Sequence, residues 1–241
     1  MRDARDRVIL ALDVPTLDQA ERLAGSCGDD LRWVKVGLEL YTAEGPRAVT
    51  AFKDRGLRVF LDLKLHDIPN TVAGAVRSAV VLGADLLTVH ATGGRAMLRA
   101  ALEARGDYRE DGLRLLAVTV LTSIEGGEFH PEIYASKDVR ERVVFLANTA
   151  ECVGLDGIVC SAGELAFLRQ VSTPGFLRVA PGIRTAGAGT DDQARVATPA
   201  AAVLSGATHM VVGRAVTAAP EPGRALRAIL DEVEDALAPG R

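Results

Sequence analysis

Short apolar runs recur at regular intervals along the chain, and this feature constrains the fold most. The runs are rich in Val, Ile and Leu, which is typical of strands buried on both faces of a parallel sheet. Stretches with helical apolar spacing separate them. The expected strands are 8–12, 33–38, 59–65, 86–89, 115–120, 157–160, 176–180 and 209–212.

The segments between these runs carry the signals of helices. Thr198 and Pro199 supply an N-cap and a proline at the first helical position, and Gly206 ends that helix. A (β/α)₈ barrel takes about 250 residues, and this chain has 241. We therefore predict an α/β fold, a single-domain (β/α)₈ TIM barrel spanning residues 1–241. A doubly wound sheet is the alternative, but no Gly-x-Gly-x-x-Gly follows the first run. The expected helices are 17–24, 71–81, 96–104, 139–153 and 200–204.

Composition excludes several classes of partner. The net charge is −4 without a basic run, and aromatic residues make up 4%, so we expect no nucleic-acid partner. The first apolar stretch is broken at Asp13 and is too short for a signal peptide or a membrane span. Cys27, Cys152 and Cys160 are odd in number and lack metal-ligand spacing, which favours packing roles in a reducing cytoplasm.

Two charged residues lie inside the third apolar run. Asp62 and Lys64 are two apart, so on a strand they share a face. A buried charge is costly unless it is paired. Asp67 follows closely enough to join the pair beyond the strand end. A buried ion pair that only fixes the fold is one interpretation; the clustering of perturbed charges at functional sites favours a catalytic one.

Lysine usage supports the catalytic interpretation. The chain has 24 arginines and only four lysines, and two of these, Lys35 and Lys64, lie in predicted strands. Arginine does not release its proton near neutral pH, whereas a lysine can. A lysine kept in a strand is therefore a candidate proton donor or a donor of hydrogen bonds to a substrate.

Barrel geometry collects the remaining polar candidates at one rim. Active sites of this fold lie at the carboxyl ends of the strands. The residues at or near those ends include Asp13, Lys35, Asp62, Lys64, Thr122 and Ser161.

An anion site is expected at the same rim. Phosphate sites in these barrels form from the loops after the last two strands. Those loops are 181–184, Pro-Gly-Ile-Arg, and 213–214, Gly-Arg. Glycine lets backbone N–H groups approach an anion, and arginine adds bidentate bonds. Residues 185–190 form a candidate lid, and Gln193 would reach inward once the lid closes.

These residues also form a known signature. The run Asp62-x-Lys64-x-His66-Asp67-Ile68-Pro69-Asn70-Thr71 resembles that of the orotidine 5′-phosphate decarboxylase family. The Asp-x-Lys-x-x-Asp core is shared with a sister group of sugar-phosphate lyases and synthases. The extension from His66 to Thr71, and the spacing from Gly-Ile-Arg to Asp-Asp-Gln, point to the decarboxylases. Further matching stretches are 11–13, 34–37, 121–123, 159–162, 181–184, 191–195 and 212–214.

The resemblance implies a reaction. Orotidine 5′-monophosphate would lose CO₂ from C6 of its pyrimidine, giving uridine 5′-monophosphate in the last step of pyrimidine nucleotide synthesis, without cofactor or metal. Lys64 would stabilise the carbanion and protonate it, and Asp62 would lie near the departing carboxylate. Asp67 would enter from the partner subunit of a homodimer, with Ile68 and Thr71 alongside.

The resemblance also implies how the nucleotide is held. Asp13 and Lys35 would bind the ribose hydroxyls, Ser161 would read the pyrimidine amide, and Thr122 would help to seat the nucleotide. The residues implied for the phosphate are Gln193, Gly213 and Arg214, with Arg184 assisting. Pro181 would line the apolar pocket that receives CO₂.

Two other functions stay open from the sequence. A Mg²⁺-dependent sugar-phosphate decarboxylase or aldol synthase would need extra acidic ligands, and the second strand offers Lys35 with Glu39 displaced beyond it. A non-catalytic nucleotide-phosphate sensor would have no reason to retain Asp62 and Lys64.

Overall fold

The computed structural model describes residues 3–106, 112–124, 130, 132, 138–184 and 197–238. Its eight parallel strands pair in chain order, and β1 pairs with β8, so that the sheet closes into a barrel. The predicted (β/α)₈ architecture is confirmed. The strands are β1 Val8–Ala11, β2 Trp33–Gly37, β3 Arg58–Leu65, β4 Leu86–His90, β5 Arg114–Val118, β6 Gly157–Val159, β7 Leu177–Ile183 and β8 His209–Val212.

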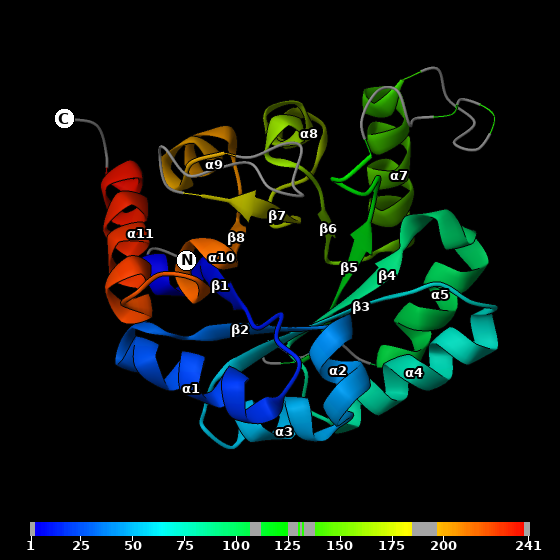
Figure 1. The fold of residues 1–241 in the computed structure, drawn as a ribbon. Coiled ribbons are helices and arrows are strands. Elements are labelled where there is room, and N and C mark those ends of the chain that lie inside the picture. The colour runs from blue at the N-terminus through cyan, green and yellow to red at the C-terminus, as the bar shows by residue number, and fades with distance from the viewer. Residues whose placement is uncertain are drawn as a thin grey trace.

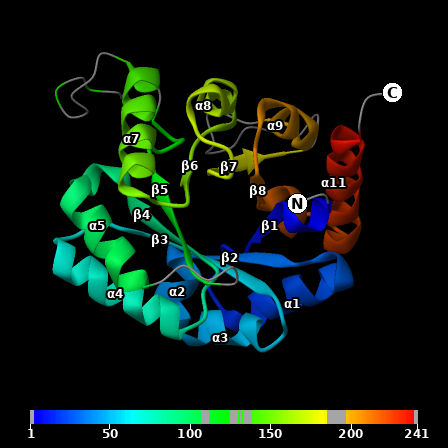
Figure 2. The same ribbon diagram turned by 180° about the vertical axis from the view of Figure 1, so that it is seen from behind.

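Helices surround the barrel on the outside (Figures 1 and 2). They begin at side-chain caps in several places; Thr198 accepts a hydrogen bond from the N–H of Ala201, and Gly206 ends the same helix in the left-handed conformation, as predicted. In the described residues the α-helices are α1 Leu17–Cys27, α2 Leu38–Glu44, α3 Arg47–Lys53, α4 Pro69–Val81, α5 Gly94–Arg105, α7 Val139–Val153, α8 Leu165–Val171, α9 Pro199–Ser205, α10 Arg214–Thr217 and α11 Pro222–Leu237.

Each predicted element corresponds to an observed one whose ends differ by at most three residues, and two corrections fall at the anion end. Pro181 to Ile183 belong to β7 rather than to a loop, because the strand rejoins β8 through Ile183 and Val212 after an irregular step. Gly182, with φ of +74°, makes that step possible. Arg214 begins α10 and is not part of a loop. The short helices α2, α3, α8 and α10 and the long α11 were not predicted.

Two apolar layers hold the barrel together, which explains why its strands read as continuous apolar runs. Inside lie Ile9, Trp33, Phe60 and their neighbours, and outside a second layer joins the strands to the helices. Packing leaves no room at Gly157, where an added Cβ would lie 2.4 Å from the Cβ of Leu177. The barrel is therefore a packed core that presents chemistry only at its ends.

A buried histidine lies at the start of β8. His209 is 2% exposed and meets the ring of Trp33 edge-on, with centroids 5.7 Å apart. Burial, reinforced by the nearby cations of Arg114, Arg7 and Arg58, lowers the pKa of His209 from 6.5 to about 3. The folded protein therefore holds this imidazole neutral.

We expect this histidine to make the protein acid-sensitive. Below pH 6.5 the unfolded chain binds a proton at His209, whereas the folded chain binds it only near pH 3. The free energy of unfolding therefore decreases as the pH falls from 6.5 to about 3. Between pH 7.5 and 5 the loss from this group is about 2 kcal/mol. Urea unfolding at pH 7.5 and at pH 5 gives the loss in free energy of unfolding between the two. This loss should be about 2 kcal/mol smaller in His209→Gln than in the wild type. The exposed His130→Gln serves as control; equal losses in wild type and His209→Gln would contradict the expectation.

Candidate active site

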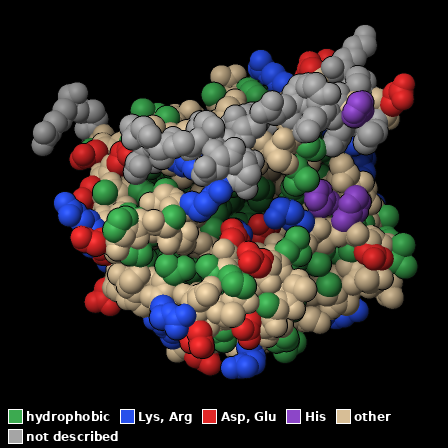
Figure 3. All heavy atoms as spheres, viewed as in Figure 1, with side chains coloured by type: hydrophobic (Ala, Val, Ile, Leu, Met, Phe, Trp, Pro, Cys, Tyr) green, Lys and Arg blue, Asp and Glu red, His purple; other side chains and the backbone are tan. Residues whose placement is uncertain are grey.

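A cavity of about 430 Å³ opens at the carboxyl ends of the strands. Figure 3 shows acidic and basic side chains gathered around a hollow in this face. Its lining comes from strands on all sides of the barrel and includes most of the residues predicted for the site. These are Asp13, Lys35, Asp62, Lys64, Thr122, Pro181, Arg184, Gly213 and Arg214.

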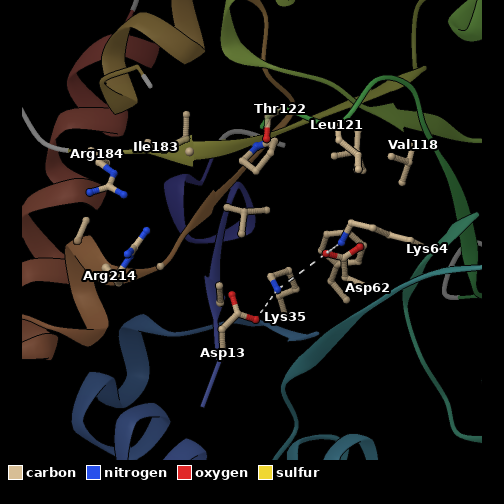
Figure 4. A pocket seen from close by; sticks show the side chains of 18 of the residues that line it. Asp13, Lys35, Asp62, Lys64, Val118, Leu121, Thr122, Ile183, Arg184 and Arg214 are labelled. Atoms are coloured by element: carbon tan, nitrogen blue, oxygen red, sulfur yellow. Dashed lines mark hydrogen bonds and ion pairs between the residues drawn. The ribbon is translucent and has the colours of Figure 1, made fainter. Parts of the chain in front are cut away.

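Acids and lysines alternate along one wall of the cavity (Figure 4). Lys35 Nζ lies 2.7 Å from Asp13 Oδ1 and 3.9 Å from Asp62 Oδ2, and Lys64 Nζ lies 2.7 Å from the same Asp62 oxygen. The inner members are the most buried, with 10% of the Lys35 side chain and 12% of the Asp62 side chain exposed. Each charge thus has an opposite neighbour, which is the condition for keeping charges in a strand.

The backbone at Lys64 is strained. With φ of +50°, Lys64 is the one non-glycine residue in the described ranges with positive φ. The ladder between β3 and β4 shifts register between Leu61 and Leu65 at this point. The simple alternation expected for a strand therefore breaks here, and the ion pair forms on an irregular backbone. Such strain costs about 1–3 kcal/mol and persists where surrounding contacts impose it.

Gly37 leaves the space that one ion pair occupies. A Cβ at this position would lie 2.7 Å from Asp13 Oδ1 and 2.8 Å from Lys35 Nζ. Any side chain at the end of β2 would therefore push these two groups apart. The sequence offered a glycine two residues beyond Lys35, but only the distances reveal its role.

Two arginines lie across the cavity from Lys64 (Figure 4). Arg184 follows β7, and its backbone N–H donates to the carbonyl of Ala197, 3.0 Å away. Arg214 follows Gly213, which caps α10. Both line the cavity, so one end carries concentrated positive charge suited to an anion.

Apolar side chains complete the lining between these charged ends. They were not predicted, because an apolar residue in a buried strand reads as core from sequence alone. They include Phe60, Val118, Leu121, Val159, Ile183 and Val211.

Three predicted residues do not line the cavity of their own chain. Asp67, Ile68 and Thr71 are exposed, and none lines the cavity. The Asp67 carboxylate accepts the N–H of Ile68 at 2.7 Å, and no ion pair joins it to Lys64, although both residues are described. The Asp-Lys-Asp cluster expected beyond the strand end is thus not made by one chain. The Ile68–Pro69 step leads directly into α4 on the outside of the barrel.

Ser161 and Gln193 are the remaining residues predicted for the site. Ser161 is fully buried and caps the short 3-10 helix Ala162–Glu164, where its N–H donates to the Glu164 carboxylate at 2.8 Å. It is not among the residues that line the cavity. Gln193 and the predicted lid at 185–190 lie outside the described residues.

The described ranges contain neither a metal-binding cluster nor a membrane-spanning helix. No group of three or more His, Cys, Asp or Glu side chains there could hold a metal ion. None of the described helices is long and apolar enough to cross a membrane.

Comparison with known proteins places the chain in a family. The model of the orotidine 5′-phosphate decarboxylase / HUMPS family matches residues 6–229. An orotidine 5′-phosphate decarboxylase of Moorella thermoacetica is 48% identical, over 96% of this chain and 93% of the relative. One from Anaeromyxobacter dehalogenans is 51% identical, over 93% and 96%.

A solved structure agrees with these relatives. The crystal structure of orotidine 5′-phosphate decarboxylase from Lactobacillus acidophilus superposes with a TM-score of 0.83 at 37% identity, covering 95% of this chain and 99% of that one. The alternating acids and lysines therefore lie in a barrel whose sequence and shape are both those of known decarboxylases. The chain belongs to the orotidine 5′-phosphate decarboxylase / HUMPS family.

Proposed function

We propose that this protein decarboxylates orotidine 5′-monophosphate to uridine 5′-monophosphate and CO₂ in pyrimidine nucleotide synthesis. The row formed by Asp13, Lys35, Asp62 and Lys64 carries this proposal, because it places a lysine ammonium in a cavity that has an anion-binding end opposite. Membership in the decarboxylase family, with relatives of that name about half identical to the chain, supports it.

The nucleotide is proposed to lie across the cavity. Its phosphate is proposed to bind Gln193, Gly213 and Arg214, with Arg184 assisting. Asp13 and Lys35, held together at 2.7 Å, take the ribose hydroxyls. Thr122 helps to seat the nucleotide, and Ser161 is proposed to read the pyrimidine amide. The ring carboxylate then lies near Asp62 and Lys64.

Lys64 carries the chemistry. When the C6–carboxylate bond breaks, its electron pair stays on C6 and CO₂ leaves. The Lys64 ammonium stabilises the growing negative charge and then gives C6 a proton; solvent restores the proton on the amine. Asp62 Oδ2, 2.7 Å from Nζ, fixes the position of that ammonium. Apolar surface beside Pro181 receives the neutral CO₂.

We propose that the site is completed by a second copy of the chain in a homodimer. Asp67, Ile68 and Thr71 do not line the cavity of their own chain, and Ile68 is 67% exposed. In a two-fold dimer the same segment of each chain serves the other's cavity.

The enzyme is proposed to act in the cytoplasm, where free thiols such as that of Cys152 stay reduced.

A direct assay separates the candidate functions. Purified protein is mixed with orotidine 5′-monophosphate, and the pyrimidine absorbance is followed with and without EDTA. We expect conversion in both. Activity lost in EDTA and restored by Mg²⁺ would instead support the sugar-phosphate decarboxylase or synthase of the same family. Binding without conversion would support a nucleotide-phosphate sensor.

We expect Arg214→Ala to weaken substrate binding and also to slow turnover. A hydrogen bond to a charged group is worth about 1.5–3 kcal/mol, so KM should rise roughly 10- to 100-fold. Turnover should fall too, because binding energy from the remote phosphate supports the chemical step. Steady-state kinetics measure both, with the exposed Arg224→Ala on α11 as control. If neither quantity changes, Arg214 is not part of the site.

A further inference from the structure

Thr88 lies directly beneath the charged row, on the neighbouring strand. It belongs to β4, is fully buried, and does not line the cavity. Its hydroxyl donates to Asp62 Oδ1 at 2.9 Å and accepts the backbone N–H of Lys64 at 2.9 Å. One hydroxyl therefore contacts both members of the pair proposed to act at C6.

These two bonds fix the direction of the Thr88 hydroxyl. A hydroxyl has a single proton, and here that proton goes to Asp62 while a lone pair accepts from Lys64. Asp62 is thereby held through both oxygens, by Thr88 at Oδ1 and by Lys64 Nζ at Oδ2. The carboxylate cannot rotate without losing one of them.

The hydrogen bond from the Lys64 backbone N–H to Thr88 lies where the ladder between β3 and β4 is interrupted. Between Leu61 and Leu65 the register with β4 shifts, and Lys64 has φ of +50°. A buried N–H at such a step loses its regular strand partner. Thr88 replaces that partner with a side chain, which lets the strained backbone persist.

We propose that Thr88 is a positioning residue that sets the place of Lys64 and Asp62 for proton delivery to C6. This inference rests on the proposed decarboxylase function and deepens it. Thr88 contacts no substrate; it acts through the two groups that do. Its removal should therefore change the rate of the chemical step more than the affinity for nucleotide.

Two substitutions separate the hydroxyl from the shape of the side chain. Thr88→Val keeps the shape and loses both bonds, whereas Thr88→Ser keeps the hydroxyl. We expect Thr88→Val to lose about 10- to 100-fold in kcat with KM nearly unchanged. Thr88→Ser should stay close to wild type. Thr149→Val, which removes a buried hydroxyl bonded to the Phe145 carbonyl in α7, controls for the loss of a buried bond elsewhere.

The outcomes are distinct. Wild-type kcat in Thr88→Val, or equal losses in Thr88→Ser and Thr88→Val, would overturn the positioning role. If Thr88→Val does not fold, Thr88→Ala provides the same comparison with serine. If the wild type fails to convert the nucleotide, the proposed function falls, and a crystal structure of the Thr88 variant still decides the inference: Lys64 Nζ should leave Asp62 Oδ2, and an unmoved pair would refute it.

Discussion

Replacing Lys64 by alanine should remove nearly all turnover while leaving nucleotide binding in place. The Lys64 ammonium stabilises charge that appears at C6 mainly in the transition state. Removing this ammonium should therefore lower kcat far more than it weakens nucleotide binding. A general acid contributes about 10²- to 10⁴-fold and electrostatic stabilisation about 10²- to 10³-fold, so we expect a loss of at least about 10⁴-fold. Stopped assays give kcat, and calorimetry with uridine 5′-monophosphate gives the affinity.

Lys53→Ala is the matched control for this result. Lys53 also forms an ion pair at 2.7 Å, with Asp85, but it lies in α3 and does not line the cavity. Its loss should leave kcat unchanged. A decrease of about tenfold or less in Lys64→Ala would mean that another group delivers the proton.

Mixing two inactive variants should restore activity if the site is shared between subunits. Lys64→Ala and Asp67→Asn homodimers should each be nearly inactive. After dissociation and random reassortment, hybrids carry both defects in one site and neither in the other, so roughly a quarter of all sites are intact. Activity should therefore recover to about that fraction of wild type.

A second mixture controls for nonspecific recovery. Asp62 and Lys64 form an ion pair within one chain, so a hybrid of Asp62→Asn with Lys64→Ala contains no intact site and should stay inactive. Native mass spectrometry establishes that subunits have exchanged. Exchange without recovery in the Lys64→Ala and Asp67→Asn mixture would show that Asp67 serves its own chain.

The barrel could be predicted because parallel strands buried on both faces leave uninterrupted apolar runs. The residues at which strands end could not be predicted in the same way, because hydrophobicity does not reveal where the hydrogen-bonded ladder stops. The fifth strand ends at Val118 although the apolar run continues to Val120, and β7 extends to Ile183 through a step that only Gly182 permits.

The charged part of the site could be predicted for a related reason. Asp62, Lys35 and Lys64 stand out because charges are unexpected in such runs. Phe60 and Val118 line the same cavity but look like ordinary core residues in sequence. The role of Gly37 depends on the space beside it that Asp13 and Lys35 fill, and the role of Thr88 depends on hydrogen bonds of 2.9 Å to the neighbouring strand. No local sequence pattern encodes either.

In the proposed reaction, CO₂ leaves C6 beside the acid–lysine row and the Lys64 ammonium protonates that carbon, so the product should carry a solvent-derived hydrogen at C6. Wild-type enzyme is given orotidine 5′-monophosphate in D₂O, where the Lys64 ammonium carries deuterium, and the product is examined by proton NMR. We expect uridine 5′-monophosphate with deuterium at C6 and one CO₂ released for each product molecule. Product with protium at C6, or an orotidine nucleotide that keeps its carboxylate, would contradict it.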